Sequence, residues 1–274
     1  MGFRVNTNVA ALNAQRNLLN TTSSLNRSLE RLSSGLRITR ASDDAAGLAL
    51  SEGFRAEIRS LIQAQRNGLD GISMLQVAEG ALNETSGNLI RMRELAIQSA
   101  NGTLGTAERA TLNAEFQDLS AEITRLANVT EFNGTTIIND STASISFQVG
   151  VNNTANDVIA VSGVDATATG LAINALVITD VATSQSALAT LDTAISTVAS
   201  QRGSFGTAQN RLESTIRSLS IAVENSSAAE SRIRDVDVAV ETANLSRLQV
   251  LQQAGVAVLA QANVSQQAAL SLLQ

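Results

Sequence analysis

The chain has 274 residues, of which only 2 % are aromatic, and it contains no Trp, Tyr, Pro, Cys or His. Because His and Cys supply the commonest general bases, thiol nucleophiles and zinc ligands, their absence argues against an enzyme and against a catalytic, metal or cofactor site. The net charge is −6 and every basic residue is Arg, without a basic cluster, which argues against partners such as nucleic acid and against a cationic membrane-surface helix.

The N-terminal region is expected to form a helix with one apolar side. Its apolar residues recur at heptad-like spacing, which is typical of a helix that packs lengthwise against a partner. They are Val5, Val9, Leu12, Leu19, Leu25, Leu29, Leu32 and Leu36. The runs SSG at 33–35 and RASDD at 40–44 predict a break after this helix. Because Asp43 and Asp44 precede an Ala-rich segment, we expect N-capping there and not an active site.

Two further helices are expected before the middle of the chain. The second runs from about Ala45 to the turn dipeptide Asn101-Gly102, and the third covers residues 107–128, since apolar residues recur on one side of each. These residues are Ile58, Ile62, Leu69, Ile72, Leu75, Leu82, Leu89 and Met92 in the second helix, and Leu112, Phe116, Leu119, Ile123 and Leu126 in the third.

The middle of the chain carries strand signals. Residues 144–149 alternate between polar and apolar side chains, as a half-buried strand does. The turn-forming run at 151–157 and the apolar run at 158–161 predict a hairpin with a return strand. Residues 162–180 are rich in small residues and Thr, and we expect weak strand character there. The fold class is therefore mainly α, with a small central β-hairpin region.

The fourth expected helix has the clearest periodicity. Eleven positions between 188 and 223 are spaced alternately three and four residues apart, and nine are apolar, which predicts a coiled-coil seam. They are Leu188, Leu191, Ile195, Val198, Arg202, Phe205, Gln209, Leu212, Ile216, Leu219 and Val223. Beyond this seam, Asp235 and Asp237 are two residues apart and would not face each other on a helix, so we expect a charged hinge.

The last segment, residues 248–274, contains no charged residue. Its longest unbroken apolar run covers only residues 254–260, which is too short for a membrane span, so no membrane insertion is expected. On a helix, one narrow arc of the segment carries Gln249, Gln252, Gln253, Asn263, Gln267 and Ser271, while Leu, Val and Ala occupy much of the rest. Large exposed apolar surfaces usually mark contact sites, so we expect neighbours on several sides.

Both ends of the sequence resemble bacterial flagellin. The resemblance is carried by VNTNVAALNAQRNL, SLERLSSGLRI and ASDDAAGLAL near the N-terminus, and by SRIRDVDVAVETANLSRLQVLQQAGVAVLAQANVSQQAALSLL near the C-terminus. It covers nearly all of residues 1–140 and 185–274. Only the middle of the chain differs from the family. There, the segment 141–184 is short, and the large variable outer domains that many flagellins carry are absent.

The resemblance implies a domain organisation and a function. Residues 1–40 with 235–274 correspond to the paired helices of the filament's inner tube, and residues 41–234 to a long antiparallel helical coiled-coil rod with a β-hairpin. The implied function is a secreted subunit that polymerises with itself into the flagellar filament, exported without a cleavable signal peptide. The expected assembly residues are Leu12, Leu19, Leu29, Leu32, Leu36, Leu248, Leu251, Val258, Leu259, Leu270 and Leu273.

The resemblance also implies particular surfaces and partners. If the C-terminal helix lines a tube, the polar arc with Gln249, Gln253, Asn263 and Gln267 is expected to face its lumen. Partners implied are an export chaperone, the filament cap and the hook–filament junction proteins. Arg91, Leu95 and Glu115 match the family's positions for Toll-like receptor 5, although Ile90 stands where receptor-activating members often carry Gln. The alternatives are a hook–filament junction protein of the same superfamily and a helical scaffold protein.

Overall fold

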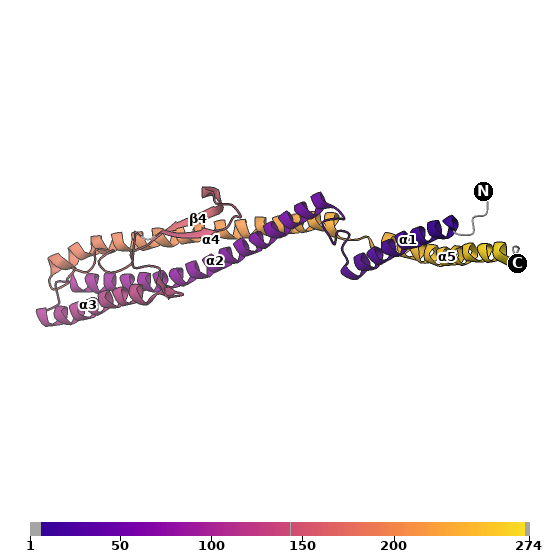
Figure 1. The fold of residues 1–274 in the computed structure, drawn as a ribbon. Helices are drawn as coiled ribbons and strands as arrows, with labels where there is room; N and C mark the ends of the chain where they lie inside the picture. The colour runs from indigo at the N-terminus through magenta and orange to yellow at the C-terminus, as the bar shows by residue number, and fades with distance from the viewer. Residues whose placement is uncertain (1–6, 143, 272–274) are drawn as a thin grey trace. The chain divides into compact units, whose positions relative to one another are not determined.

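The computed structural model describes residues 7–142 and 144–271, and for residues 265–271 it describes the backbone alone. Over these ranges the fold is mainly α with small antiparallel hairpins (Figure 1), as the sequence predicts. The elements in chain order are α1 (Val9–Ser34), α2 (Ala45–Ser99), α3 (Thr106–Val129), β1 (Glu131–Phe132), β2 (Thr135–Thr136), β3 (Ser144–Gln148), the 3-10 turn η1 (Ala155–Asp157), β4 (Val158–Ser162), α4 (Val181–Arg234) and α5 (Val238–Ser271). Among the described residues, no helix is both long enough and apolar enough to cross a bilayer.

The chain divides into two compact units. The terminal unit comprises residues 1–57 and 225–274, and the central unit comprises residues 58–224. The terminal unit contains α1, α5, the start of α2 and the end of α4, and the central unit contains the rest. Each unit therefore has its own packing, built from segments that are distant in sequence.

In the terminal unit, α1 and α5 pack antiparallel along their lengths. Asn8 Nδ2 donates to the carbonyl of Ala262 at 3.0 Å near one end of the pair, and Ser28 Oγ donates to the Glu241 carboxylate towards the other. Both Ser28 and Glu241 are buried. A buried carboxylate needs a hydrogen-bond donor to offset its lost hydration, and Ser28 supplies one.

The predicted breaks between helices are confirmed, and short polar residues make them. Gly35 ends α1 in the left-handed conformation, with φ 72°, which glycine adopts without a steric penalty. The Asp44 carboxylate accepts the amide of Gly47 at 2.8 Å and so caps the start of α2. Asp237 likewise accepts the amides of Ala239 and Val240 at the start of α5.

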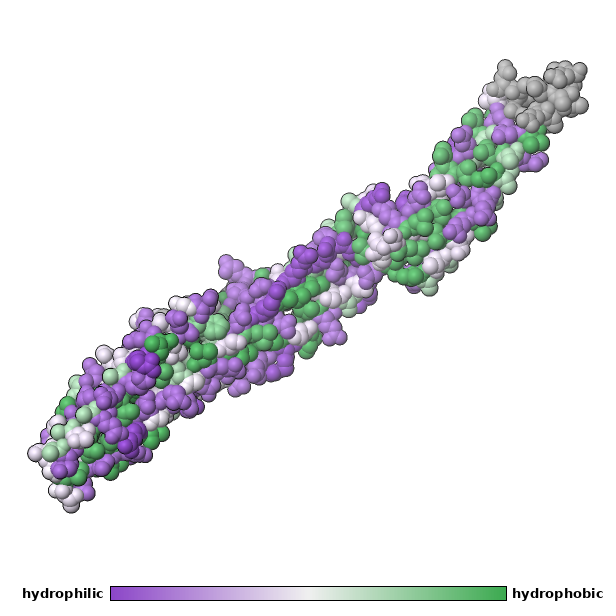
Figure 2. Space-filling view, turned by 90° about the horizontal axis from the view of Figure 1, so that it is seen from below, coloured by the Kyte–Doolittle hydropathy of each residue, from purple (hydrophilic) through white to green (hydrophobic). Residues whose placement is uncertain are grey.

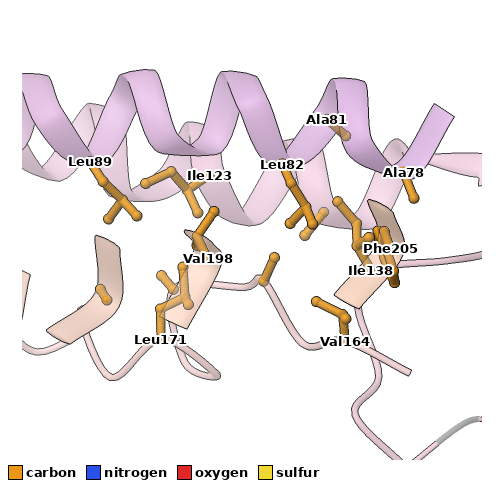
Figure 3. Close-up of a cluster of buried hydrophobic side chains, with 14 of the residues drawn as sticks. Ala78, Ala81, Leu82, Leu89, Ile123, Ile138, Val164, Leu171, Val198 and Phe205 are labelled. Carbon is orange, nitrogen blue, oxygen red and sulfur yellow. The ribbon is translucent and has the colours of Figure 1, made fainter. Parts of the chain in front are cut away.

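In the central unit, α2 and α4 run antiparallel, and α3 and the segment after it complete the core. Gln65 forms a hydrogen bond with Ser220, and Arg93 forms an ion pair with Asp192. Residue numbers therefore increase along α2 in the direction in which they decrease along α4. Figure 3 shows Leu82 and Leu89 of α2 facing Val198 of α4, with Ile123 of α3 and Leu171 of the following segment beside them. Phe116 and Phe205 are the largest side chains buried in this core.

The predicted seam on α4 is half correct. Alternate members are fully buried or nearly so, whereas the intervening ones are only half-buried. The buried members are Leu191, Val198, Phe205, Leu212 and Leu219. The second buried row lies one residue before the half-buried positions and contains Ala187, Ala194 and Ala208. Small side chains let two helices approach closely, and a pattern search that favours large apolar residues selects the flanking row.

The predicted hairpin is confirmed, and a second, shorter one precedes it. β3 pairs with β4 antiparallel, with Phe147 opposite Ile159. β1 pairs with β2 around Asn133 and Gly134, which both have positive φ, as the two central residues of a type I′ turn require. The Asn-Gly dipeptide is the strongest short-range signal for such a turn.

The expected strand character at 162–180 is wrong apart from Ser162, which ends β4, and an isolated bridge at Asp165. The backbone makes local turns instead, including the Ile173 amide to the Ala168 carbonyl at 2.8 Å. Six of its apolar residues are nevertheless buried in the central core, whereas Val177 is exposed. The six are Val164, Ala166, Ala168, Leu171, Ile173 and Ile178. The segment therefore covers the core as an irregular loop.

The hairpin rests on a glycine of α2, and this gives a first prediction. A Cβ on Gly71 would lie 2.9 Å from Phe147 Cδ1, whereas a Cβ on Gly80 of the same helix would meet nothing within 4 Å. Gly80→Ala is expected to stabilise the chain through helix propensity, and Gly71→Ala to be less stable than Gly80→Ala by about 1–3 kcal/mol through overpacking. Urea unfolding of the two variants measures the difference. Equal stabilities would show that Phe147 moves aside at no cost.

Candidate assembly surfaces

The first candidate surface is the side of α1 that does not face α5. The contact with α5 uses Ala14, Leu25 and Ser28, which are buried. Leu12, Leu19 and Leu29 lie off this contact and are between 47 % and 64 % exposed. Large aliphatic side chains exposed on one helix form an apolar surface that the terminal unit itself leaves uncovered.

The second candidate surface belongs to α5. Leu248 and Leu259 are half-buried on the side facing α1. Leu251 and Val258 each stand one position from that row and are 50 % and 58 % exposed. Val240, Val250, Val256 and Val264 are also more than half exposed. Figure 2 shows hydrophobic residues, in green, exposed on one face of the molecule.

The expected lumen residues lie on another side of α5. Gln249 and Gln253 each follow a residue of the α1-facing row, Leu248 and Gln252, and both are exposed. Asn263 follows Ala262 in the same way and is also exposed. One flank of the α1-facing row therefore carries these three amides together with Val256 and Ala260, and Leu251 and Val258 lie on the other flank.

The remaining assembly predictions fall in two groups. Leu32 and Leu36 are only half-buried, Leu32 within α1 and Leu36 in the linker after it. Leu270 and Gln267 belong to the part of α5 whose side chains are not described, and Leu273 lies outside the described residues. These last three positions remain predictions from the sequence.

The linkers that join α1 to α2 and α4 to α5 bind each other. The Val236 amide donates to the Gly35 carbonyl at 3.0 Å, and the Arg37 amide donates to the Arg234 carbonyl at 2.7 Å. The Arg37 guanidinium also donates to the carbonyl of Ile233, with Nη2 at 2.6 Å. Because the last carbonyls of a helix lack intrahelical donors, Arg37 satisfies two of them at the end of α4, one with its amide and one with its guanidinium. The linkers are thus mutually bound, which the sequence did not indicate.

Two carboxylates beside the linkers are held in their charged form. Burial opposes the charge of Asp43, but hydrogen bonds from Thr39 and Arg40 and the nearby Arg31 outweigh it, so its pKa lies below the ordinary value. At Glu52, the hydrogen bond from Arg234 and then the one from Arg55 lower the pKa. The Arg234 Nη1 to Glu52 Oε1 distance is 2.7 Å, and this contact ties α4 to α2.

The lowered pKa of Glu52 gives a second prediction. A carboxylate whose pKa falls on folding stabilises the protein above its unfolded pKa, ordinarily 4.5, and this contribution is lost as the pH falls through the folded pKa. Glu52→Gln is therefore expected to lower the melting temperature slightly at pH 7 and to match the native chain in acid below that pKa. Thermal melts over a pH series measure this. Glu57→Gln is the control on the same helix, because Glu57 forms no ion pair within the described residues.

The residues expected to bind the receptor differ in how exposed they are. The Arg91 guanidinium is exposed and donates to Glu115 at 2.8 Å and to Glu94 at 3.1 Å, and these contacts, Glu115 first, raise its pKa. Ile90 beside it is 49 % exposed. Leu95, by contrast, is fully buried in the central core, so its side chain is not available to a partner that docks on this face. Its apolar spacing, which it shares with the core row, is the signal that could have predicted burial.

Comparison with known proteins points to one family at both ends of the chain. The family model for the bacterial flagellin N-terminal helical region matches residues 5–143, and the one for the C-terminal helical region matches residues 188–273. A flagellin from Halalkalibacterium halodurans is 47 % identical over 171 residues, which cover 62 % of this chain and 63 % of that relative.

Solved structures share the fold. The crystal structure of Bacillus cereus flagellin is 32 % identical, with a TM-score of 0.50 over 56 % of this chain and 88 % of that one. A putative flagellar hook-associated protein from Vibrio parahaemolyticus has a TM-score of 0.60 over 70 % of this chain and all of that one, at 16 % identity. At that identity the second likeness shows the fold alone.

Proposed function

The chain belongs to the bacterial flagellin family, and on that premise we propose that it is a structural subunit that polymerises helically into the flagellar filament. The observation that carries the proposal is the apolar surface of the terminal unit, where Leu12, Leu19, Leu251 and Val258 are at least half exposed. These side chains cannot all be covered by the α1–α5 pair, since they lie outside its contact. A neighbouring copy would bury them.

A helical polymer follows from contacts between different faces of identical subunits. When such a heterologous contact does not close a ring, it extends into an open filament. The exposed side chains of α1 and those of α5 supply two different faces of that kind. Electron microscopy of the purified chain tests the proposal: long filaments support it, and a chain that stays monomeric in every condition that polymerises other flagellins contradicts it.

The proposed placement within the filament follows the sequence motifs. Residues 1–40 with 235–274 would form the inner tube, and residues 41–234 would pack outside it. The protein would be located outside the cell, in the flagellum. Its first partner is another copy of itself; the further partners proposed are an export chaperone, the filament cap and the hook–filament junction proteins.

A receptor role is a narrower proposal. Arg91 and Glu115 are exposed and adjacent, which suits recognition by Toll-like receptor 5, while buried Leu95 would act only by supporting the helix. Binding of the soluble chain to the receptor ectodomain, compared with Arg91→Ala, tests this. An unchanged affinity in the variant would remove Arg91 from the site.

The lumen proposal yields a third prediction. Gln249 and Gln253 carry no charge and no large apolar surface, so a wall made of them would stay hydrated without attracting passing chains. Gln249→Leu with Gln253→Leu is expected to slow filament elongation more than it lowers the melting temperature of the filament. Time-lapse imaging of labelled filaments in cells measures the growth rate. Elongation at the native rate would show that these residues do not line the channel.

A further inference from the structure

Two polar residues interrupt the predicted seam of α4, and the structure brings both to one carboxylate. Arg202 Nη2 lies 3.8 Å from Glu79 Oε1, and Gln209 Nε2 donates to Glu79 Oε2 at 3.3 Å. Arg202 and Gln209 are one heptad apart, so Glu79 of α2 is bracketed by equivalent positions on α4. All three residues belong to the central unit.

This cluster lies midway between the two outer polar contacts of the helix pair. Gln65–Ser220 and Arg93–Asp192 are 28 residues apart on both helices, which is four heptads. Glu79 is two heptads from Gln65 and two from Arg93. The antiparallel pair therefore keeps one register over this whole length, and the Glu79 cluster marks its centre.

Heptad spacing alone does not determine that register. Both helices bury side chains at heptad spacing, so a shift of seven residues would again place apolar residues against apolar residues. The row of Glu79 on α2 has Ile72 one heptad before it, and the row of Arg202 and Gln209 on α4 continues with Ile195 and Ile216. A one-heptad shift would move Glu79 between Ile195 and Arg202, or between Gln209 and Ile216, and would remove one of its two partners.

The contacts of Glu79 with Arg202 and Gln209 are expected to add little to the stability of the fold. Glu79 keeps 39 % and Arg202 keeps 35 % of the side chain exposed, so water screens the ion pair. Arg202 Nε and the neighbouring Gln201 Oε1 are buried without a hydrogen-bond partner among the described residues. Single polar residues in helical seams are known to specify register at a cost in stability.

We propose that Glu79, with Arg202 and Gln209, is a register lock that selects the native stagger of α2 against α4. The lock acts within one chain and does not depend on the filament function. Replacing all three residues by Leu removes the polar discrimination while keeping side chains that can pack in the seam. The register then becomes degenerate by one heptad.

Disulfide trapping tests the lock, because the chain contains no Cys. A Cβ on Gly68 would lie 3.0 Å from Ile216 Cγ1, so Gly68→Cys with Ile216→Cys reports the native register. Gly68→Cys with Val223→Cys reports a one-heptad shift. Each pair is placed in the native full chain and in the variant Glu79→Leu, Arg202→Leu, Gln209→Leu, and the bonded peptides are identified by mass spectrometry.

We expect the shifted pair to form at least about tenfold more disulfide in the triple variant than in the native background, at unchanged helix content. The control removes the exposed ion pair with Arg93→Leu and Asp192→Leu and is expected to leave the native register alone. If the triple variant fails to fold, Glu79→Gln replaces it and is expected to increase the shifted product less. Exclusive trapping of the native pair in every lock variant would overturn the proposal.

Discussion

A chain that lacks residues 248–274 is expected to remain monomeric under conditions in which the full chain forms filaments. The deletion removes Leu251 and Val258 from the exposed side of α5 and Leu248 and Leu259 from the side facing α1. Fully burying a Leu or Val side chain contributes about 1.5–3 kcal/mol, and each subunit would lose several such contacts. Sedimentation and electron microscopy measure the loss of polymer.

The deletion should leave the central unit folded, because its core uses residues 74–212. A second variant separates assembly from the α1–α5 contact. Leu251→Asn with Val258→Asn changes only side chains that are half exposed already, so it is expected to raise the critical concentration for assembly about tenfold at nearly native melting temperature. A truncated chain that polymerises at the native critical concentration would contradict the assembly role of this segment.

The helices could be predicted from the sequence because their signals are local and repeated. Heptad spacing, the glycine at position 35 and the aspartates before α2 and α5 each act within a few residues. The sequence predicts α4 too short. The predicted helix covers residues 188–223, whereas the observed helix is Val181–Arg234. Its first turn is set by Asp180, whose carboxylate accepts the Thr183 amide at 2.9 Å, and its last turns are polar and carry no apolar period.

Features that depend on distant contacts could not be predicted. The irregular path of residues 163–178 follows from the space left beside α2, α3 and α4. The buried residues Val164, Ala166 and Ala168 alternate with polar ones, a pattern that predicts a strand and not the observed loop. The same holds for Ser28 with Glu241, and for the linker contacts of Arg37, which join residues about 200 positions apart. For the candidate surfaces, the sequence identifies which residues are apolar. Only the structure shows which of them are covered in the contact between α1 and α5 and which stay exposed.

Arg109→Leu is expected to be among the most destabilising single substitutions in the central unit. Arg109 is 7 % exposed, and its guanidinium donates to the carbonyls of Ser99 at 2.8 Å, Asn101 at 2.9 Å and Leu104 at 3.1 Å. These bonds satisfy backbone carbonyls at the end of α2 and in the turn before α3, where no intrahelical N–H group is available to donate. Leu supplies no donor, so the buried carbonyl of Ser99 is left unsatisfied and the partly buried carbonyls of Asn101 and Leu104 each lose a bond. An unsatisfied buried carbonyl costs about 1–3 kcal/mol, and we expect a loss of about that size.

Arg125→Leu, on the same helix α3, separates this effect from the loss of a charge. The Arg125 side chain is 58 % exposed, and among the described residues its ion pair is with Glu122, one turn away, so its replacement should leave the free energy of unfolding nearly unchanged. Urea unfolding followed by circular dichroism compares the two variants, and hydrogen exchange at residues 99–104 locates the change. Because a single guanidinium donates to three carbonyls spread over residues 99–104, Arg109→Lys should recover only part of the loss. Equal stability of the two Leu variants would mean that water replaces the Arg109 guanidinium at this turn.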